Sequence, residues 1–588
     1  MYKAPVADMK FALDVLQKDM PHLAASLPDQ EMIDVILTEA GKLASDVIAP
    51  LNHEADKAGG AKRLDDGTVQ TPNGFADAFA QLAEGGWTSM EASETYGGQE
   101  MPLALSSCVN EMWQASNMAF SLCHLLTQGL VSALQHSANE AQKQIFVPPM
   151  VEGRWTGTMN LTEPQAGTDL AAIKTKAVKN GDHYLISGQK IYITYGEHDM
   201  AENIIHLVLA RTPDAPAGHK GISVFLVPKF LINEDGSLGA QNDVHCVSIE
   251  KKLGIKGSPT AVLQYGDNGG AVGYLVGDEN QGLAIMFGMM NHARFNVGLQ
   301  GLALSDRALQ QALSYAEARV QGAPLGRDAK SPIIHHPDVT RLLGQMKAES
   351  EAMRALMIYG AALLDEAEAG DSDVKSRADF MIPIIKGWLT EQSLIMTSHN
   401  VQIHGGMGFI EETGAAQHYR DARILPIYEG TTAIQSNDLL FRKTIRDKGA
   451  EAKALLAEIA NHATSAAQDA NSAIRQLAEN LTAKTIEAQE AIDSLLSREN
   501  QPREIAASGV AYLMMLGHLT GGWMLLKQGQ EAVKQSQASD ADHAFLGNKL
   551  ASLRLFTALS LPQVSSLAQS VRLAGEATES LSVADWLG

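Results

Sequence analysis

Glu429 is the residue whose surroundings most suggest chemistry. It lies in the run Ile427–Thr432 (IYEGTT), between a hydrophobic segment and two threonines that can start a helix. A carboxylate held in such a place can act as a general base. A glutamate near a helix N-terminus can also be there simply because negative charge is mildly favourable at that end of a helix. The segments that accompany Glu429 decide between these two interpretations.

Four other segments carry polar residues that could bind a ligand: Asn160–Asp169, Gly188–Thr194, Tyr315–Gln321 and Gln402–Phe409. In the last segment, paired glycines let backbone N–H groups approach oxygen atoms closely. The glycines do not have the G-x-G-x-x-G spacing of a dinucleotide-binding fold, and the chain has no P-loop pattern. Both observations argue against NAD and ATP as direct ligands.

The stretch from Gln402 to Thr431 resembles, without a gap, the C-terminal signature of the acyl-CoA dehydrogenase family. It begins with QIHGGMGF, continues through Tyr419–Arg423 (YRDAR) and closes on Glu429. A match of this length is far more specific than a short pattern. The resemblance implies that Glu429 removes the α-proton of an acyl-CoA thioester while N5 of FAD accepts the β-hydride. The product would be the trans-2-enoyl-CoA.

The resemblance also implies which residues bind FAD. In Asn160–Asp169 (NLTEPQAGTD), Thr162 corresponds to a threonine that hydrogen-bonds the flavin ring. In Gly188–Thr194 (GQKIYIT), Tyr192 and Thr194 correspond to residues that cover the ring and bond to it. Arg319 corresponds to an arginine that reaches the FAD pyrophosphate of a neighbouring subunit. The other FAD contacts that we expect are Gln321, His336, Gln402, Gly405, Gly406 and Thr431.

Substrate contacts follow from the same resemblance. The residues concerned are Thr168, which would lie beside the pantetheine arm, and Asn291, Arg294 and Gly430. The Glu429 backbone N–H and a ribityl hydroxyl of FAD would polarise the thioester carbonyl. Some family members carry the base just before the arginine of the segment that reads NHAR here. That position is Ala293 in this chain, which favours Glu429 as the base.

Five positions depart from the family pattern. Tyr192 stands in the place of a tryptophan but keeps a flat surface for stacking. Thr168 replaces a serine, Gly322 a phenylalanine that contacts the flavin, Ala433 a glutamine on the adenine side, and Asn291 an aspartate. The contacts to adenine and to the substrate are therefore less well defined by the sequence than the contacts to the flavin ring.

Composition excludes several functional classes. The chain has 46 Lys and Arg against 68 Asp and Glu, a formal charge of -22, and no dense basic run, so we expect no nucleic-acid binding. Three scattered cysteines are too few for a disulfide framework or a thiolate metal site. The pair His335-His336 and the spacing of His399 and His404 do not place two imidazoles on one helix face, so we expect no metal.

Two segments bear on the cellular location. The first ten residues carry charge where a secretory segment would be apolar, so we expect a cytoplasmic protein. Ile505–Leu526 has no Lys, Arg, Asp or Glu, and its length could span a bilayer. Its serine, histidine, threonine and four glycines favour a buried helix in a bundle instead, so we expect no integral membrane association.

The pattern of apolar residues predicts an α+β multidomain fold. Helical spacing runs from about residue 30 to 155, ending at Pro148-Pro149, and returns near Leu283. Between them lie six β-rich runs (174–178, 184–187, 190–194, 204–210, 222–227 and 261–265), with Asn180-Gly181 as a type I′ hairpin signal. We expect an N-terminal α domain (1–156), a central β-barrel-like domain (157–275), a C-terminal four-helix bundle with the base (276–445) and an additional helical domain (446–588).

The additional domain resembles that of longer bacterial family members, which include the 3-methylmercaptopropionyl-CoA dehydrogenases. The resemblance implies 3-methylmercaptopropionyl-CoA or a fatty acyl-CoA as substrate, an electron-transferring flavoprotein as electron acceptor, and a homodimer. Three alternatives stay open at this point. They are an acyl-CoA oxidase of the same fold, a flavin monooxygenase, which needs no α-proton base, and a non-catalytic acyl-CoA-binding or assembly protein.

Overall fold

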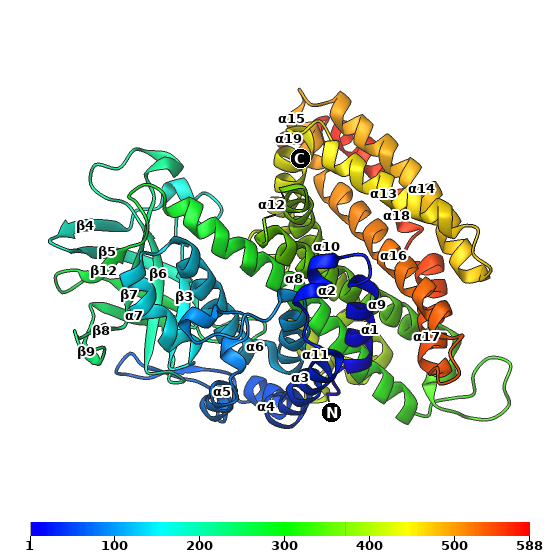
Figure 1. Cartoon of the computed structure of the whole chain (residues 1–588), viewed down its shortest axis with the longest axis horizontal. Coiled ribbons are helices and arrows are strands. Elements are labelled where there is room, and N and C mark those ends of the chain that lie inside the picture. Colours follow the sequence, from blue (N-terminus) through cyan, green and yellow to red (C-terminus); the bar gives the residue numbers. More distant parts are fainter. Residues whose placement is uncertain (1, 371, 588) are drawn as a thin grey trace. The chain divides into compact units, whose positions relative to one another are not determined.

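The structure, a computed structural model, describes residues 2–370 and 372–587 and forms two compact units (Figure 1). Unit 1 consists of Met1–Gly41, Pro102–Ala115 and Val297–Gly588, and unit 2 of Lys42–Met101 and Ser116–Asn296. Two long helices, α6 (Leu103–Ser137) and α8 (Gly282–Ala318), contribute residues to both units. Helices precede and follow the strands along the chain, which confirms the predicted class of fold.

The centre of unit 2 is an eight-stranded sheet with the order β10-β11-β5-β12-β7-β6-β3, in which β4 also pairs with β5. Its strands are β3 (Trp155–Asn160), β4 (Lys176–Asn180), β5 (His183–Thr194), β6 (Asn203–Ala210), β7 (Ser223–Pro228), β10 (Val244–Ile249), β11 (Thr260–Tyr265) and β12 (Ala271–Leu275). Strand β3 runs parallel to β6, and the other pairings are antiparallel. All six predicted runs fall on strands, whereas β3, β10 and β12 were not predicted.

Strand β5 unites two of the predicted runs. Its first part pairs with β4 and β12, and its second part pairs with β11. The two parts meet at Gly188, which has a φ of +147°. A Cβ at this position would lie 2.6 Å from Oγ1 of Thr175, so only glycine lets the backbone pass there. The bend turns one continuous strand from one set of neighbours to the next.

The hairpin predicted at Asn180-Gly181 is present, but its turn is shifted by one residue. Asn180 is the last residue of β4 and pairs with His183. The two loop residues are therefore Gly181 and Asp182, with a positive φ of 67° at Gly181. The type I′ assignment to Asn180-Gly181 was wrong, because the backbone pairing of the strands extends through Asn180.

Short elements complete unit 2. They are η1 (Ala44–Ile48, a π-helical segment), α4 (Ala49–Lys57), β1 (Lys62–Arg63), β2 (Val69–Gln70), α5 (Phe75–Glu84), η2 (Trp87–Ser89), η3 (Glu94–Tyr96), α7 (Glu140–Val151), η4 (Leu170–Ala172), η5 (Gly218–Gly221), β8 (Phe230–Ile232) and β9 (Leu238–Gln241). Pro148 and Pro149 lie inside the last turn of α7 rather than after it. The helix ends at Val151 and Gly153 follows with a φ of +76°.

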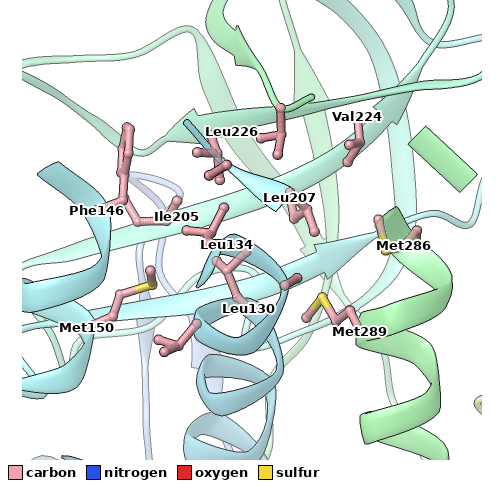
Figure 2. Packing of buried hydrophobic residues seen from close by; sticks show 14 of the residues in the cluster. Leu130, Leu134, Phe146, Met150, Ile205, Leu207, Val224, Leu226, Met286 and Met289 are labelled. Atoms are coloured by element: carbon pink, nitrogen blue, oxygen red, sulfur yellow. The ribbon is translucent and has the colours of Figure 1, made fainter. Parts of the chain in front are cut away.

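Helices of unit 2 cover one face of the sheet with an apolar core. Figure 2 shows this packing at close range, with side chains from α6, α7 and the start of α8 against strands β6 and β7. The labelled residues are Leu130, Leu134, Phe146, Met150, Ile205, Leu207, Val224, Leu226, Met286 and Met289. Within α6, Asn117 departs from helical geometry (φ −159°, ψ 91°), and its Oδ1 accepts a hydrogen bond from the Phe120 N–H at 3.1 Å. Asn117 thereby caps the second part of α6.

Unit 1 is helical. Its elements are α1 (Val6–Leu16), α2 (Pro21–Ser26), α3 (Gln30–Leu43, which ends in unit 2), η6 (Ile333–His335), α9 (Pro337–Glu368), α10 (Ser372–His404), η7 (Gly405–Phe409), η8 (Glu411–Thr413), α11 (Ala415–Ala422), α12 (Thr432–Asn437) and η9 (Asp438–Ile445, π-helical). The additional C-terminal helices are α13 (Ala450–Ala466), α14 (Ser472–Ser497), α15 (Pro502–Ala507), α16 (Gly509–Gln535), α17 (His543–Leu559), α18 (Gln563–Glu579) and α19 (Val583–Leu587).

Helix α16 contains most of the uncharged segment that was long enough to span a bilayer, whose first residues, from Ile505, belong to α15. It is the one helix, in the part of the chain that the structure describes, with the length and hydropathy of a membrane span. In its most apolar window 83% of the residues are buried inside the protein. It packs against α10, α14, α17 and α18, which confirms the interpretation as a core helix of a bundle.

A buried ionic network ties the N-terminal helix of unit 1 to its core and to the additional helices. Arg354 of α9 donates to Glu111 of α6 at 2.6 Å and to Asp306 of α8 at 2.9 Å. Lys549 of α17 forms ion pairs with Asp8 of α1 and with a glutamate of α9. Charges buried to this degree persist only when they are paired, so the network fixes how these helices pack.

Candidate active site

Glu429 lies in a tight turn between α11 and α12. The turn contains two successive residues with positive φ, Glu429 at 55° and Gly430 at 83°. Thr431 caps α12, because its Oγ1 accepts a hydrogen bond from the Ile434 N–H at 3.4 Å, as the sequence predicted. A left-handed conformation is unfavourable for a residue other than glycine, and it clusters at functional sites where the surrounding structure enforces it.

Three side chains hold this turn from inside unit 1. Lys386 of α10 is fully buried, and its Nζ donates to the carbonyl oxygens of Leu425 and Gly430 at 2.8 Å each. Gln435 of α12 donates from Nε2 to the carbonyl oxygens of Glu429 at 3.1 Å and Gly430 at 3.3 Å. The hydroxyl of Thr432 donates to Glu391 of α10 at 2.6 Å. The half-buried Glu429 therefore sits on a fixed backbone.

Tyr428 anchors the same turn from its other side. Its hydroxyl donates to Oε1 of Gln300, and Gln300 donates from Nε2 to Gln114 at 3.1 Å. Burial, and then the neighbouring carboxylate of Glu429, raise the pKa of Tyr428. The phenol is therefore protonated at neutral pH and is the donor to Gln300.

The residues predicted to bind the FAD diphosphate form a second group in unit 1. Arg319 follows the end of α8, is exposed, and donates to Oε1 of Gln321 at 3.3 Å. Nε2 of His336 lies 2.9 Å from the carbonyl oxygen of Gln321. The Ile333 N–H donates to the Arg319 carbonyl oxygen at 2.7 Å. These contacts gather Arg319, Gln321 and His336, which are separated in sequence, into one place.

Gln402, Gly405 and Gly406 lie at the end of α10, and one ring contact connects this end to the end of α8. The rings of Tyr315 and His404 stack with centroids 4.1 Å apart and an interplanar angle of 22°. Gln402 and both glycines are exposed, and a Cβ built on either glycine would meet no atom within 4 Å. Exposed glycine backbone that a ligand can approach closely, together with the Arg319 guanidinium, is suited to phosphate oxygens, so the residues present fit the diphosphate of FAD.

In unit 2, the segment of Thr162 is bound to strand β5. The Ile191 N–H donates to the carbonyl oxygen of Thr162 at 2.9 Å. Lys190, fully buried, donates from Nζ to the Leu161 carbonyl oxygen at 2.9 Å and to Glu163 at 2.8 Å. Lys190 therefore fixes the residues on both sides of Thr162, as Lys386 fixes the turn around Glu429 in unit 1.

Tyr192 and Thr194 lie farther along β5. Tyr192 has a φ of +60° and is 61% exposed, so its ring offers an open face for stacking on a flat ligand. Thr194 is half-buried and pairs with Thr260 of β11. Because Ile191 bonds to Thr162, the three residues predicted to contact the flavin ring belong to two adjoining segments of unit 2, and they fit a flavin.

The predicted substrate residues of unit 2 lie in two places. Thr168 is exposed in the loop before η4, whereas Asn291 and Arg294 lie on α8. Arg294 is buried, which rules out a surface role, and Ala293, the alternative position for a base, is buried as well. Gly430, the fourth predicted substrate residue, belongs to the turn of Glu429 in unit 1.

A polar cluster beside Asn291 and Arg294 was not predicted. Nε2 of His292 lies 3.2 Å from Oε2 of Glu91, and Asn296 donates to the His292 carbonyl oxygen at 3.1 Å. His124 of α6 is buried nearby, and burial lowers its pKa to about 4, so the imidazole is neutral at pH 7. No sequence signal pointed to these residues, because they come from three segments far apart in the chain.

The predicted residues thus form two groups in unit 1 and two in unit 2. Among the residues that the structure describes, no cluster of three or more His, Cys, Asp or Glu could hold a metal ion. Cys108, Cys123 and Cys246 are free and buried. The lysines that hold the site segments were missed as functional, although Lys190 lies within a recognised motif.

Models of protein families match most of the chain. The acyl-CoA dehydrogenase N-terminal domain matches residues 30–154, the middle domain 158–267 and the C-terminal domain 280–443. A fourth model, described as acetyl-CoA dehydrogenase C-terminal like, matches residues 455–582, within the additional helices.

Full-length relatives and a solved structure agree with these matches. The chain is 44% identical over 96% of its length to a 3-methylmercaptopropionyl-CoA dehydrogenase of Ruegeria pomeroyi, of which it covers 97%. It is 34% identical to a broad-specificity linear acyl-CoA dehydrogenase, FadE5, of Mycobacterium tuberculosis, with 96% of each chain covered. In fold it resembles Caenorhabditis elegans ACDH-11, solved in complex with C11-CoA (TM-score 0.77, 20% identity, covering 95% of this chain and 92% of that one).

Proposed function

This chain belongs to the acyl-CoA dehydrogenase family, and from that premise we propose that it oxidises an acyl-CoA thioester to the trans-2-enoyl-CoA with FAD as cofactor. The observation that carries the proposal is the turn of Glu429. It presents a half-buried carboxylate on a backbone with two successive positive φ angles, held by buried donors. A carboxylate fixed in this way can remove a poorly acidic proton without a reorganisation of the protein.

Glu429 takes the α-proton in this proposal, and its backbone N–H donates to the thioester carbonyl as negative charge develops on that oxygen. The Gln435 contact to the Glu429 carbonyl oxygen fixes the peptide plane that follows Glu429, and Lys386 fixes the next one. Tyr428 holds the preceding side chain through Gln300. The backbone on both sides of Glu429 is thus held in place.

Thr162, Tyr192 and Thr194 would hold the flavin ring, and the group that includes Arg319, Gln402, Gly405 and Gly406 would hold the diphosphate. When bound, FAD supplies the hydride acceptor that the chain's own side chains lack. The exposed ring of Tyr192 would cover the flavin, with Gln321, His336 and Thr431 as further contacts.

We propose 3-methylmercaptopropionyl-CoA as the substrate. The support is the 44% identity to the Ruegeria pomeroyi enzyme over nearly the whole of both chains, including the additional helices. Identity to the mycobacterial enzyme with linear acyl-CoA specificity is 34% over a similar length. Thr168, Asn291, Arg294 and Gly430 would contact this substrate.

The proposal includes two partners. Electrons would leave through an electron-transferring flavoprotein, as the family resemblance implies. We further propose a homodimer in the cytoplasm, in which Arg319 contacts the FAD of the partner subunit. The exposure of Arg319 at the end of α8 is compatible with that role. Light scattering of the flavin-loaded protein tests the dimer, and a monomer with a full complement of FAD would contradict it.

An acyl-CoA panel tests the proposed function. The purified protein, with FAD content measured, is assayed anaerobically for dye reduction with 3-methylmercaptopropionyl-CoA and with straight-chain acyl-CoAs of several lengths. We expect the highest kcat/KM with 3-methylmercaptopropionyl-CoA. Higher values with a straight-chain acyl-CoA would overturn the substrate but keep the reaction. Peroxide release at the rate of turnover, in air without dye, would identify an oxidase instead, and a protein that binds no FAD would favour the non-catalytic alternative.

A further inference from the structure

The proposed function uses one contact of Lys386 with the turn of Glu429, that with the Gly430 carbonyl oxygen, but assigns Lys386 no role in the reaction. Lys386 belongs to α10, more than forty residues before the turn, and it is fully buried. Its Nζ lies 2.8 Å from two carbonyl oxygens, that of Leu425 before the turn and that of Gly430 directly after Glu429. A single ammonium group therefore closes the turn at both of its ends.

The backbone of this turn needs such a restraint. Glu429 and Gly430 both have positive φ, and a left-handed glutamate is stable only where the surroundings enforce that conformation. Without these hydrogen bonds, Glu429 would relax toward a negative φ. The side chain would then point in a different direction from the backbone. Because proton transfer requires the base within hydrogen-bond reach of its proton, a displacement of about 1 Å lowers the rate strongly.

A role in packing alone does not explain why a lysine occupies position 386. A buried lysine is costly because its charge loses water, and a methionine at this place in α10 would fill a similar volume without that cost. The ammonium group donates to carbonyl oxygens on both sides of the proposed base. These two hydrogen bonds restrain the backbone of the base, which apolar packing would not do.

We propose that Lys386 is a positioning residue for the reaction. By donating to the Leu425 and Gly430 carbonyl oxygens it holds Glu429 in the left-handed conformation. The inference rests on the proposed function, because it assigns Lys386 a role only if Glu429 is the base.

Lys386→Met tests this role in the FAD-loaded enzyme. We expect kcat to fall about 100-fold, the size of effect that misplacement of a reacting group produces, with KM changed less than threefold. Lys386→Arg, which retains the charge and several donors, should recover at least tenfold of the lost kcat.

Lys549→Met is the matched control. Lys549 is a buried lysine of the same unit, 3% exposed and paired with Asp8 and Glu351, and it has no contact with the turn of Glu429 in the structure. This variant should be less stable than the wild type but should keep its kcat and its KM. If Lys386→Met does not fold, Lys386→Gln replaces it, since an amide is too short to reach both carbonyl oxygens. The same pattern of effects is expected.

The outcomes show whether the positioning role of Lys386 fails alone or together with the proposed function. A wild-type kcat in the folded Lys386→Met variant overturns the positioning role, as does a loss of kcat that Lys549→Met reproduces in full or that Lys386→Arg does not partly restore. Glu429→Gln distinguishes failure of the assigned base from failure of the positioning role of Lys386. If that variant is inactive while Lys386→Met is fully active, only the inference about Lys386 fails. If Glu429→Gln keeps full activity, the assignment of the base fails first, whatever Lys386 does.

Discussion

Lys190 and Glu163 form a buried ion pair in unit 2, with Nζ 2.8 Å from Oε1. Burial opposes ionisation of Glu163, but the Lys190 ammonium and the hydrogen bonds from Thr175 and Lys174 outweigh it, so the pKa of Glu163 falls to about 2. Because Lys190 also bonds to Leu161, the pair fixes the segment that carries Thr162.

Replacement of Lys190 by methionine should destabilise unit 2 and weaken FAD binding. The change leaves the Glu163 carboxylate buried without its cation, and breaking a buried pair in this way costs about 3 kcal/mol or more. Urea unfolding and the FAD-to-protein ratio after gel filtration measure the two effects. Lys179→Met, on the exposed part of β4, is the control and should change neither quantity.

Acid should remove part of the stability through Glu163. Its folded pKa of about 2 is below the ordinary value of 4.5, so its contribution is fully present above pH 4.5 and is lost as the pH falls toward 2. In Glu163→Gln the free energy of unfolding should depend less steeply on pH between 4.5 and 3, by on the order of 1 kcal/mol. Equal slopes for variant and wild type would refute the ionised state of Glu163.

Gly188→Ala should disrupt the bend of β5. A Cβ there meets Thr175 at 2.6 Å on a backbone with a φ of +147°, so we expect a loss of about 2 to 4 kcal/mol and a lower FAD content. Gly181→Ala is the matched comparison, because its φ is also positive but no atom lies within 4 Å of the new Cβ. That variant should lose only about 1 kcal/mol. Thermal unfolding that ranks the two in the opposite order would contradict the clash.

Tyr192 should contribute to FAD affinity through its ring. Loss of an aromatic stacking partner in Tyr192→Ala costs about 1 kcal/mol, so the Kd for FAD should rise about fivefold. Tyr192→Trp, which installs the residue more common in the family, should bind FAD at least as tightly as the wild type. Fluorescence titration of the apoprotein with FAD measures both, and an unchanged Kd in Tyr192→Ala would show that the ring does not cover the flavin.

The spacing of apolar residues predicted helices and strands well wherever a segment follows one period, helical or alternating. The six β-rich runs all lie on strands, and helical spacing returned close to the true start of α8 at Gly282. Strand β3 was missed because its residues are nearly all buried, so they show no alternation of polar and apolar side chains. Strand β5 was divided in two because a glycine marks a bend as readily as a loop.

The sequence predicted those residues of the candidate site that lie within continuous motifs, and it missed those that only folding brings together. The run from Gln402 to Thr431 pointed to Glu429, and the structure adds that its turn is left-handed. Lys386 could not be predicted, because its two partners are 39 and 44 residues away in sequence. The cluster of His124 and His292 was hidden for the same reason, since only folding brings α6 and α8 together.

Anaerobic mixing of the FAD-loaded enzyme with 3-methylmercaptopropionyl-CoA tests the central claim most directly. The wild type should lose its flavin absorbance near 450 nm in one turnover and form the enoyl-CoA, whereas Glu429→Gln should bind the thioester and retain its absorbance, because no group removes the α-proton. Bleaching of Glu429→Gln at the wild-type rate would contradict the account.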